Sequence, residues 1–174
     1  RFFILFVLSL YVVGFSAERS KVFRGYSGST YVEMGGGTMP FHPSRSSTYV
    51  SVGKKFERGR NGLDFSIAHQ MTSIFDNYLS VRGLYTRRIA KNFYIGFGPG
   101  LGNYMDPIPK TGGTWGNIQA STLEGVAGYH FAPQSRIKPA LQLHLTQPAH
   151  VFHNSIGHKV RHTPSFALSF NLRF

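Results

Sequence analysis

The last ten residues alternate strictly between apolar and polar side chains. The apolar positions are Phe166, Leu168, Phe170, Leu172 and Phe174, and small or polar residues fill the positions between them. Because successive side chains of a β-strand point to opposite faces, this segment predicts a strand with one apolar and one polar face. The chain is therefore expected to form a sheet that separates apolar from polar side chains.

Residues 1–16 have the layout of a secretory signal peptide. A basic residue precedes the apolar run Phe2–Val13, and small residues follow it. This run is shorter than the roughly 20 apolar residues of a membrane-spanning helix, so we expect a cleaved leader and an exported protein. Residues 17–28 are then expected to form an N-terminal periplasmic segment, ahead of a single domain over residues 29–174.

Composition narrows how the exported domain can cross a membrane. After the leader, no apolar stretch approaches the length of a spanning helix, whereas the chain has 20 glycines and 15% aromatic residues. A chain without such a helix crosses lipid as a closed β-barrel, because an open sheet edge leaves backbone groups unsatisfied there. The chain has no Cys, which excludes disulfides and zinc–thiolate sites, and we expect no cofactor.

The domain divides into eight alternating segments, each near the roughly 9–11 residues that a tilted membrane strand needs. We expect strands at residues 29–39, 46–57, 62–71, 77–87, 92–104, 115–131 and 136–147 and in the C-terminal segment. Short connections at 57–61, 87–91 and 131–135 alternate with connections at 40–45, 72–76, 105–114 and 148–162, two of which are long. This alternation is typical of outer-membrane barrels and places both termini in the periplasm.

The terminal strand, which ends on an aromatic residue, resembles the C-terminal signature strand of bacterial outer-membrane β-barrels. That signature is recognised by the outer-membrane assembly machinery. The pattern from about Ser29 to Phe174 resembles the small OmpA/OmpX type of eight-stranded outer-membrane protein, although specific motif identity is confined to the last strand. The resemblance implies an all-β, antiparallel up-and-down transmembrane barrel in the bacterial outer membrane, with a structural or surface-interaction role.

The polar face of the expected strands decides what lies inside the barrel. It carries Glu33, Asp64, Arg82, Glu124, His144 and Arg173. In a membrane barrel these groups meet in the lumen, where near-balance of acids and bases suits pairing, since an unpaired buried charge costs several kcal/mol. Side chains about fill an eight-stranded barrel, so we expect a plugged lumen. The alternative is a soluble periplasmic, lipocalin-like barrel whose apolar face lines a ligand cavity.

A formal net charge of +12 at pH 7 favours an anionic partner. Export argues against nucleic acid and for lipopolysaccharide or another anionic surface. The basic residues expected to bind it in the outer loops are Arg45, Lys110, Lys159 and Arg161. Alternatively, many of the charges only fringe the membrane and line the lumen.

Aromatic residues fall near several of the expected strand ends: Tyr26, Tyr49, Tyr78, Tyr104, Trp115 and Tyr129. Outer-membrane barrels carry aromatic girdles at both membrane interfaces, which is one interpretation of these positions. General β-propensity also favours Tyr and Trp, so both interpretations stay open.

The expected loop 148–162 contains His150, His153, His158 and His162. Imidazoles bind zinc or copper, but these spacings match no defined site, and the loop has no acidic residue to orient the rings. We therefore expect no metal site, and a polar loop that gains positive charge as the pH falls.

The sequence His153-Asn154-Ser155 resembles the His-x-Ser pair of outer-membrane lipid A deacylases, which are eight-stranded barrels. In that family the His acts as base, the Ser acts as nucleophile, and a Glu about a dozen residues later orients the His. Here position 167 is Ala and no acidic residue follows Glu124. A His without an orienting partner is a poor general base, and this pair falls in an expected loop. We expect no enzymatic activity, with a lipid A-modifying hydrolase as the alternative.

Glycines occupy alternate positions from Gly96 to Gly102. The run superficially suggests a phosphate-binding loop, but no convincing helix follows it. Glycines at alternate strand positions are expected instead to allow curvature or to make room for bulky neighbours in the lumen, and Gly35 to Gly37 invite the same interpretation.

Overall fold

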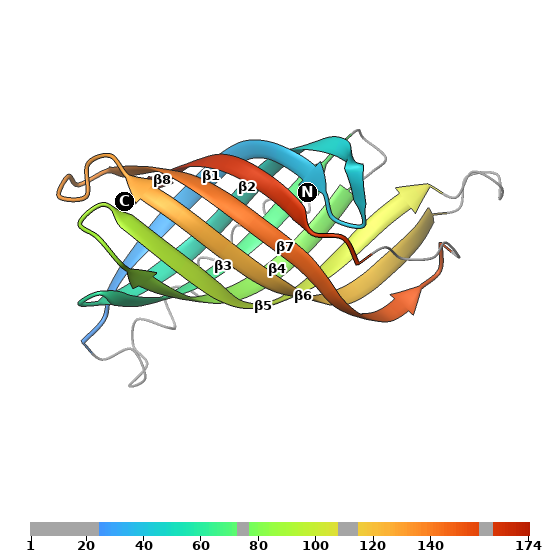
Figure 1. Cartoon of the computed structure of the whole chain (residues 1–174), viewed down its shortest axis with the longest axis horizontal. Coiled ribbons are helices and arrows are strands. Elements are labelled where there is room, and N and C mark those ends of the chain that lie inside the picture. Colours follow the sequence, from blue (N-terminus) through green and yellow to red (C-terminus); the bar gives the residue numbers. More distant parts are fainter. Residues whose placement is uncertain (1–24, 73–76, 108–114, 157–161) are drawn as a thin grey trace.

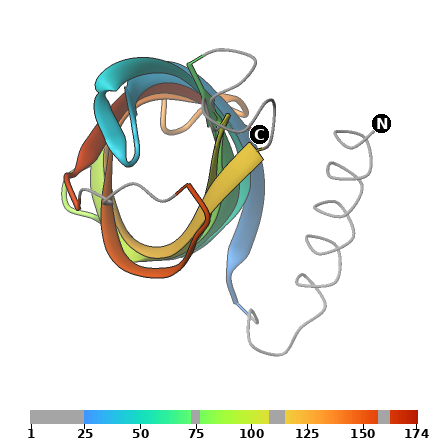
Figure 2. The ribbon, with the colours of Figure 1, turned by 90° about the vertical axis from the view of Figure 1, so that its right-hand side faces the viewer.

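A computed structural model describes residues 25–72, 77–107, 115–156 and 162–174. Eight antiparallel strands form a closed barrel, in which each strand pairs with its neighbours in sequence and the last pairs with the first (Figures 1 and 2). The strands are β1 (Ser27–Met39), β2 (His42–Arg58), β3 (Asn61–Met71), β4 (Asn77–Arg88), β5 (Phe93–Pro107), β6 (Trp115–His130), β7 (Lys138–Asn154) and β8 (Ser165–Arg173). The predicted eight-stranded up-and-down architecture is confirmed. The expected signal peptide lies outside the described residues.

Among the described residues, no helix is both long enough and apolar enough to cross a membrane.

The two ends of the barrel differ in their connections. Three short turns, at residues 59–60, 89–92 and 131–137, meet at one end, which we call the turn end. The connections that follow β1, β3, β5 and β7 meet at the opposite end, which we call the loop end (Figure 1). In the tightest turn, Gly59 has a φ of 63°, a conformation that two-residue hairpin turns require and that glycine adopts without strain.

β2 and β7 extend furthest beyond the strands that the sequence pattern predicted. β2 begins at His42, so the expected loop over 40–45 shrinks to a tight turn in which Phe41 has a φ of 69°. β7 continues to Asn154, well beyond the expected end at residue 147. The residue that follows the expected end is Pro148. In the structure Pro148 pairs with Thr122 next to a register shift, and a bulge is a position where a sheet tolerates proline.

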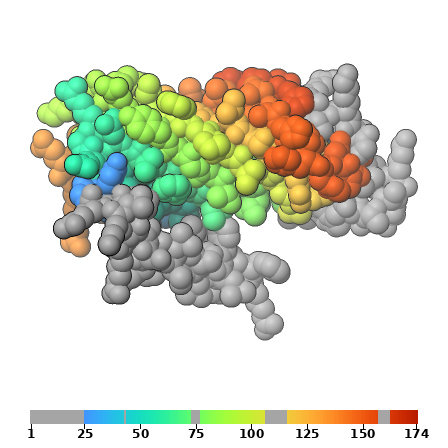
Figure 3. Space-filling model, turned by 90° about the horizontal axis from the view of Figure 1, so that it is seen from below, coloured from blue at the N-terminus to red at the C-terminus, as the bar shows by residue number. Residues whose placement is uncertain are grey.

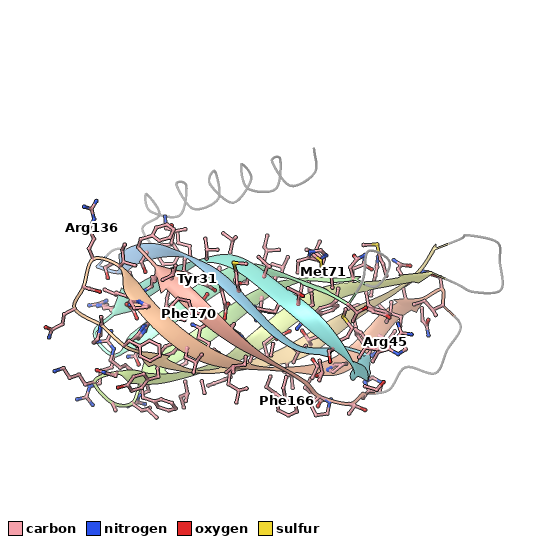
Figure 4. The ribbon with its side chains drawn as sticks, turned by 90° about the horizontal axis from the view of Figure 1, so that it is seen from above. Tyr31, Arg45, Met71, Arg136, Phe166 and Phe170 are labelled. Carbon is pink, nitrogen blue, oxygen red and sulfur yellow. The ribbon has the colours of Figure 1, made fainter. Side chains whose placement is uncertain are left out.

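The apolar faces of the strands point outward. On β7, Leu141, Leu143 and Leu145 are 42%, 48% and 38% exposed, while the polar residues between them are buried. β8 shows the same alternation, and its labelled Phe166 and Phe170 project from the barrel wall (Figure 4). In the space-filling view, side chains of successive strands cover the wall side by side (Figure 3). We call this exposed apolar surface the apolar belt.

The barrel closes where the backbone of β1 approaches β8 closely. A methyl group at Gly35 would lie 2.0 Å from the carbonyl oxygen of Leu168, and one at Gly37 would lie 2.0 Å from that of Phe166. Real side-chain carbons do not come so near a backbone oxygen, so only glycine fits at these two positions. The glycine run in β1 is therefore needed for the seam between the first and last strands.

We predict that Gly35→Ala destabilises the barrel by about 1–3 kcal/mol, because the new methyl group must push β8 away. Gly36→Ala is the matched control, since its methyl group would face outward at an ordinary 3.4 Å from the nearest atom, the Ser47 carbonyl oxygen. Urea unfolding, followed by the gel-mobility difference between folded and heated protein, measures both. Equal midpoints for the two variants would contradict this account of the seam.

Candidate functional site

The six ionisable residues predicted to face the lumen are all buried in the barrel interior. They come from six strands, and their exposed fractions are 1% for Glu33, 5% for Asp64, 3% for Arg82, 4% for Glu124, 4% for His144 and 3% for Arg173. They do not form one cluster. The structure brings three of them together at mid-barrel and gives the other three separate partners.

The central cluster is built around Arg82 and Glu33. Arg82 Nη2 lies 3.6 Å from Glu33 Oε2, and its Nε donates to Ser66 Oγ at 2.9 Å. Glu33 also accepts hydrogen bonds from Tyr49 OH and Ser169 Oγ. This carboxylate therefore joins β1, β2, β4 and β8 through its neighbours. A buried ion pair with its remaining hydrogen-bonding groups satisfied in this way avoids the cost of an isolated buried charge.

His144 connects the two charged groups of this cluster. Arg82 Nη1 lies 3.1 Å from His144 Nδ1, and His144 Nε2 contacts Glu33 Oε1. A guanidinium can only donate, so Nδ1 must accept, and the ring proton sits on Nε2, where it is donated to Glu33. The His144 ring also stacks on Tyr49, with centroids 5.1 Å apart. The imidazole is thus fixed in orientation on both sides.

The remaining two carboxylates are held by hydroxyl groups. Tyr31 OH donates to Asp64 Oδ1 at 2.7 Å. Thr122 Oγ1 and Thr146 Oγ1 donate to the two oxygens of Glu124, each at 2.7 Å. Short hydroxyl–carboxylate bonds of this kind are among the stronger hydrogen bonds in proteins, so each buried carboxylate has its own fixed donors.

Arg173 belongs to a second ionic cluster, at the mouth of the turn end. Its Nη1 lies 3.0 Å from Glu57 Oε1, and Lys55 Nζ and Arg88 Nη2 each lie 3.7 Å from the same oxygen. The sequence analysis did not select Lys55, Glu57 or Arg88. The signal was present, since Lys55 and Glu57 share the odd-numbered inward face of β2 with Ser51 and Gly53.

Aromatic and aliphatic side chains fill the interior at the loop end. Met39, Phe41, Tyr78, Tyr104, Ile118, Ala120 and Ile156 form one buried cluster. The interpretation of Tyr49, Tyr78 and Tyr104 as girdle residues was wrong, because they are 2%, 2% and 0% exposed and point inward. On β2, β4 and β5 these tyrosines lie on the same strand face as the residues that line the lumen. Tyr129, by contrast, faces outward and is 45% exposed.

Glycines make room for interior tyrosine rings. A methyl group at Gly53 would lie 2.4 Å from the Tyr31 ring, one at Gly102 would lie 2.2 Å from Tyr78 OH, and one at Gly128 would lie 2.3 Å from the Tyr94 ring. The run Gly96 to Gly102 is part of strand β5, so the phosphate-loop interpretation does not apply. Glycine placement across neighbouring strands therefore sets where the rings lie inside the barrel.

The histidines do not assemble a metal site in the part of the chain that the structure describes. His150 and His153 lie on the extension of β7, which corrects the prediction that they belong to a loop, and His158 is outside the described residues. Across the described ranges, no group of three His, Asp or Glu side chains is arranged to hold a metal ion.

Ser155 directly follows Asn154, the last residue of β7, and lies two residues after His153. Ser155 Oγ accepts from the Asn117 backbone N–H at 2.8 Å and lies 3.1 Å from Asn117 Oδ1. Both His153 and Ser155 are exposed. The hydroxyl group is thus oriented by an amide side chain of β6, and the resemblance to the deacylase pair rests on sequence spacing.

Of the four basic residues predicted to bind an anionic surface, Arg45 is the one within the described ranges. Arg45 is exposed near the start of β2, which corrects the prediction that it lies in a loop, and Figure 4 shows it at the loop end. Lys110, Lys159 and Arg161 lie outside the described residues.

We predict that Glu33→Gln lowers the free energy of unfolding by about 3–5 kcal/mol, because Arg82 loses its buried counter-charge. The double variant Glu33→Gln with Arg82→Gln should recover part of this loss, since neither charge remains. Glu124→Gln is the control, with an expected loss of about 1–2 kcal/mol for two hydroxyl hydrogen bonds. Urea titration of the wild type and the three variants measures this, and a double variant no more stable than Glu33→Gln would contradict the pairing.

Comparison with known proteins gives one line of evidence about the fold. No family model matches the chain, and no curated protein matches it. The crystal structure of Neisserial surface protein A (NspA) is similar, with a TM-score of 0.64 over 86% of this chain and 96% of that chain. The sequence identity is 11%, so the likeness establishes a shared eight-stranded barrel fold.

Proposed function

We propose that this protein is an integral barrel of the bacterial outer membrane with a structural or surface-interaction role. One observation carries the proposal: the closed barrel has its apolar residues outside and its paired charges inside. Large apolar side chains on every strand but β2 are 38% to 67% exposed across the belt. A closed barrel leaves no strand edge unsatisfied in lipid. Strands of membrane barrels alternate in this way, with apolar side chains outward and polar side chains inward.

The inward and outward faces argue against the soluble alternative. A lipocalin-like barrel would direct the leucines of β7 into a ligand cavity, whereas here they face outward and the polar Gln142, His144 and Thr146 face inward. An exposed apolar surface of this extent marks a contact with lipid or with other proteins. Lipid is the contact that surrounds a barrel on all sides, as the belt does.

The interior supports a role other than conduction or catalysis. The charge clusters at mid-barrel and at the turn end, together with the apolar cluster at the loop end, occupy the lumen along its length. The proposed role is therefore carried by the outer surface and the loops. Contact between loop-end basic residues and lipopolysaccharide remains part of this proposal, with Arg45 as its described member.

The proposed orientation follows from the connections. Outer-membrane barrels place short turns in the periplasm and longer loops outside the cell, so the turn end would face the periplasm. The outward face of β8, with its alternating Phe and Leu residues, is the segment proposed to be recognised by the outer-membrane assembly machinery.

We predict that Leu143→Arg destabilises the vesicle-inserted barrel by about 2–4 kcal/mol, the cost of a basic residue on the lipid face near the bilayer midplane. Phe152→Arg is the control. Phe152 is 61% exposed on the same strand, but lies on the extension toward the loop end, where the expected cost is about 0–1 kcal/mol. Urea unfolding from phosphatidylcholine vesicles measures both. Equally small effects would indicate that water, not lipid, surrounds the belt.

We also predict that Ser155→Ala leaves lipid A unchanged, because the proposed role is non-enzymatic. The measurement is a mass spectrum of lipid A from cells that express the wild-type protein, the Ser155→Ala variant or no protein. A deacylated species that appears with the wild-type protein and disappears with the variant would instead establish the hydrolase.

A further inference from the structure

The basic residues of the barrel are concentrated at one end. Of the twelve Lys and Arg residues in the described ranges, Arg82 lies at mid-barrel and Arg45 lies at the loop end. The other ten lie in the half of the barrel toward the turn end: Lys54, Lys55, Arg58, Arg60, Arg87, Arg88, Lys91, Arg136, Lys138 and Arg173. Figure 4 shows Arg136 and Arg45 at opposite ends.

Some of these ten residues face the interior, where acidic groups offset them. Lys55, Arg88 and Arg173 surround Glu57, and Lys55 pairs in register with Asp64. Lys138 begins β7 at the mouth, half-buried. The six others lie on the outer wall or in the turns, and we call them the basic ring: Lys54, Arg58, Arg60, Arg87, Lys91 and Arg136.

No acidic side chain shares the outer surface with the basic ring in the described part of the chain. The acidic residues of that half are Glu57, whose partners are interior cations, and buried Asp64. The acidic residues in the described ranges therefore do not offset the charges of Arg58, Arg60, Arg87, Lys91 and Arg136 as they offset the central cluster. A concentration of one sign of charge on an outer surface attracts ions of the opposite sign.

The ring extends around the barrel past all three turns of the turn end, from β2 to the β6–β7 turn, and in the described ranges only β8 and β1 have no member on the strand or on an adjoining turn. Its members come from β2, the β2–β3 turn, β4, the β4–β5 turn and the β6–β7 turn. A globular partner would contact one side of a barrel, whereas a lipid leaflet contacts its whole circumference. The arrangement therefore fits lipid better than a protein.

The ring also borders the aromatic edge of the apolar belt. Tyr85 packs edge-on against Phe97, and Tyr129 packs edge-on against Phe131, all four exposed on the outer wall. Lys54 Nζ lies over the ring of Phe56, 5.6 Å from its centre. Aromatic rings and long basic side chains occupy this position where hydrocarbon meets lipid headgroups.

We propose that the basic ring binds the headgroups of anionic phospholipids in the leaflet at the turn end, which is the periplasmic leaflet in the proposed orientation. This inference rests on the proposed membrane location and adds the partner. Basic residues near an anionic leaflet are attracted to its phosphates, and the attraction weakens within a Debye length. The ring therefore selects anionic over zwitterionic lipid at one end of the barrel and fixes how deeply that end sits.

Two tryptophan probes test the proposal in the intact chain. Tyr129→Trp places a probe beside the ring, and Met71→Trp places one on the outer wall at the loop end, each in a Trp115→Phe background that removes the native tryptophan. Each protein is refolded into phosphatidylcholine vesicles that contain 20 mole per cent of brominated phosphatidylglycerol or of brominated phosphatidylcholine. Bromine quenches a nearby tryptophan, so the ratio of the two quenching levels reports which lipid is enriched at the probe.

At position 129 we expect brominated phosphatidylglycerol to quench at least about twofold more strongly than brominated phosphatidylcholine. At position 71 we expect a ratio near one. The variant with all six ring residues changed to Gln should bring the ratio at 129 to one, as should 0.5 M salt, which screens exposed charges. A variant with Lys and Arg exchanged at the six positions keeps the charge and should keep the enrichment.

Three results would overturn the proposal. They are a ratio of one at position 129 in the wild-type ring, equal enrichment at positions 129 and 71, and an enrichment that survives replacement by Gln. A folded protein whose probes are quenched by neither brominated lipid would instead disprove the membrane location, and the ring's partner with it. The gel-mobility difference on heating confirms in each case that the variant has folded.

Discussion

Closure of the sheet is the constraint on which this structure depends. Once β8 pairs with β1, every strand has two neighbours, and every second side chain is forced into a confined interior. Charges placed there cannot reach bulk water and must find partners within a few ångströms. The pairing of Glu33 with Arg82, and of Glu57 with Arg173, follows from that confinement.

The seam between β1 and β8 depends on the absence of a side chain at two positions of β1. Because Gly35 and Gly37 lie where the β8 backbone comes closest, their missing side chains allow the ladder to close. The same device recurs inside the barrel, where Gly53 makes room for the ring of Tyr31 and so lets its hydroxyl group reach Asp64. Glycine positions thus control both the closure of the wall and the geometry of the polar interior.

Much of this could be predicted from the sequence, because alternation of period two assigns each residue to a face once a strand is recognised. It placed Arg82 and His144 on the same face as Glu33, and the structure has all three inside. Alternation alone does not say which strands lie at the same height, so the contact between Glu33 and His144, 111 residues apart, needed the register. The register between β6 and β7 also shifts at two places, which no simple pattern encodes.

Errors in the sequence analysis have a common physical origin. The girdle interpretation of Tyr49 and Tyr78, one of two left open, rested on their distance from strand ends, although each lies two residues from the inward-facing Ser51 or Ser80. The expected strand ended before Pro148, yet this residue pairs with Thr122 beside a register shift, where a sheet tolerates proline. In both cases a local preference was overruled by the position of the residue in the closed sheet.

The net charge shows why topology must precede any argument about partners. Four acidic side chains, Glu33, Glu57, Asp64 and Glu124, face Lys55, Arg82, Arg88 and Arg173 across the interior, four against four. These residues therefore contribute nothing to the excess of +12. Within the described residues the excess comes from the outer surface and the mouth, and most of it lies at the turn end. Composition alone left open whether the charges lie in the loops, fringe the membrane or line the lumen, because it cannot distinguish a charge that a neighbour offsets from one that meets the surroundings.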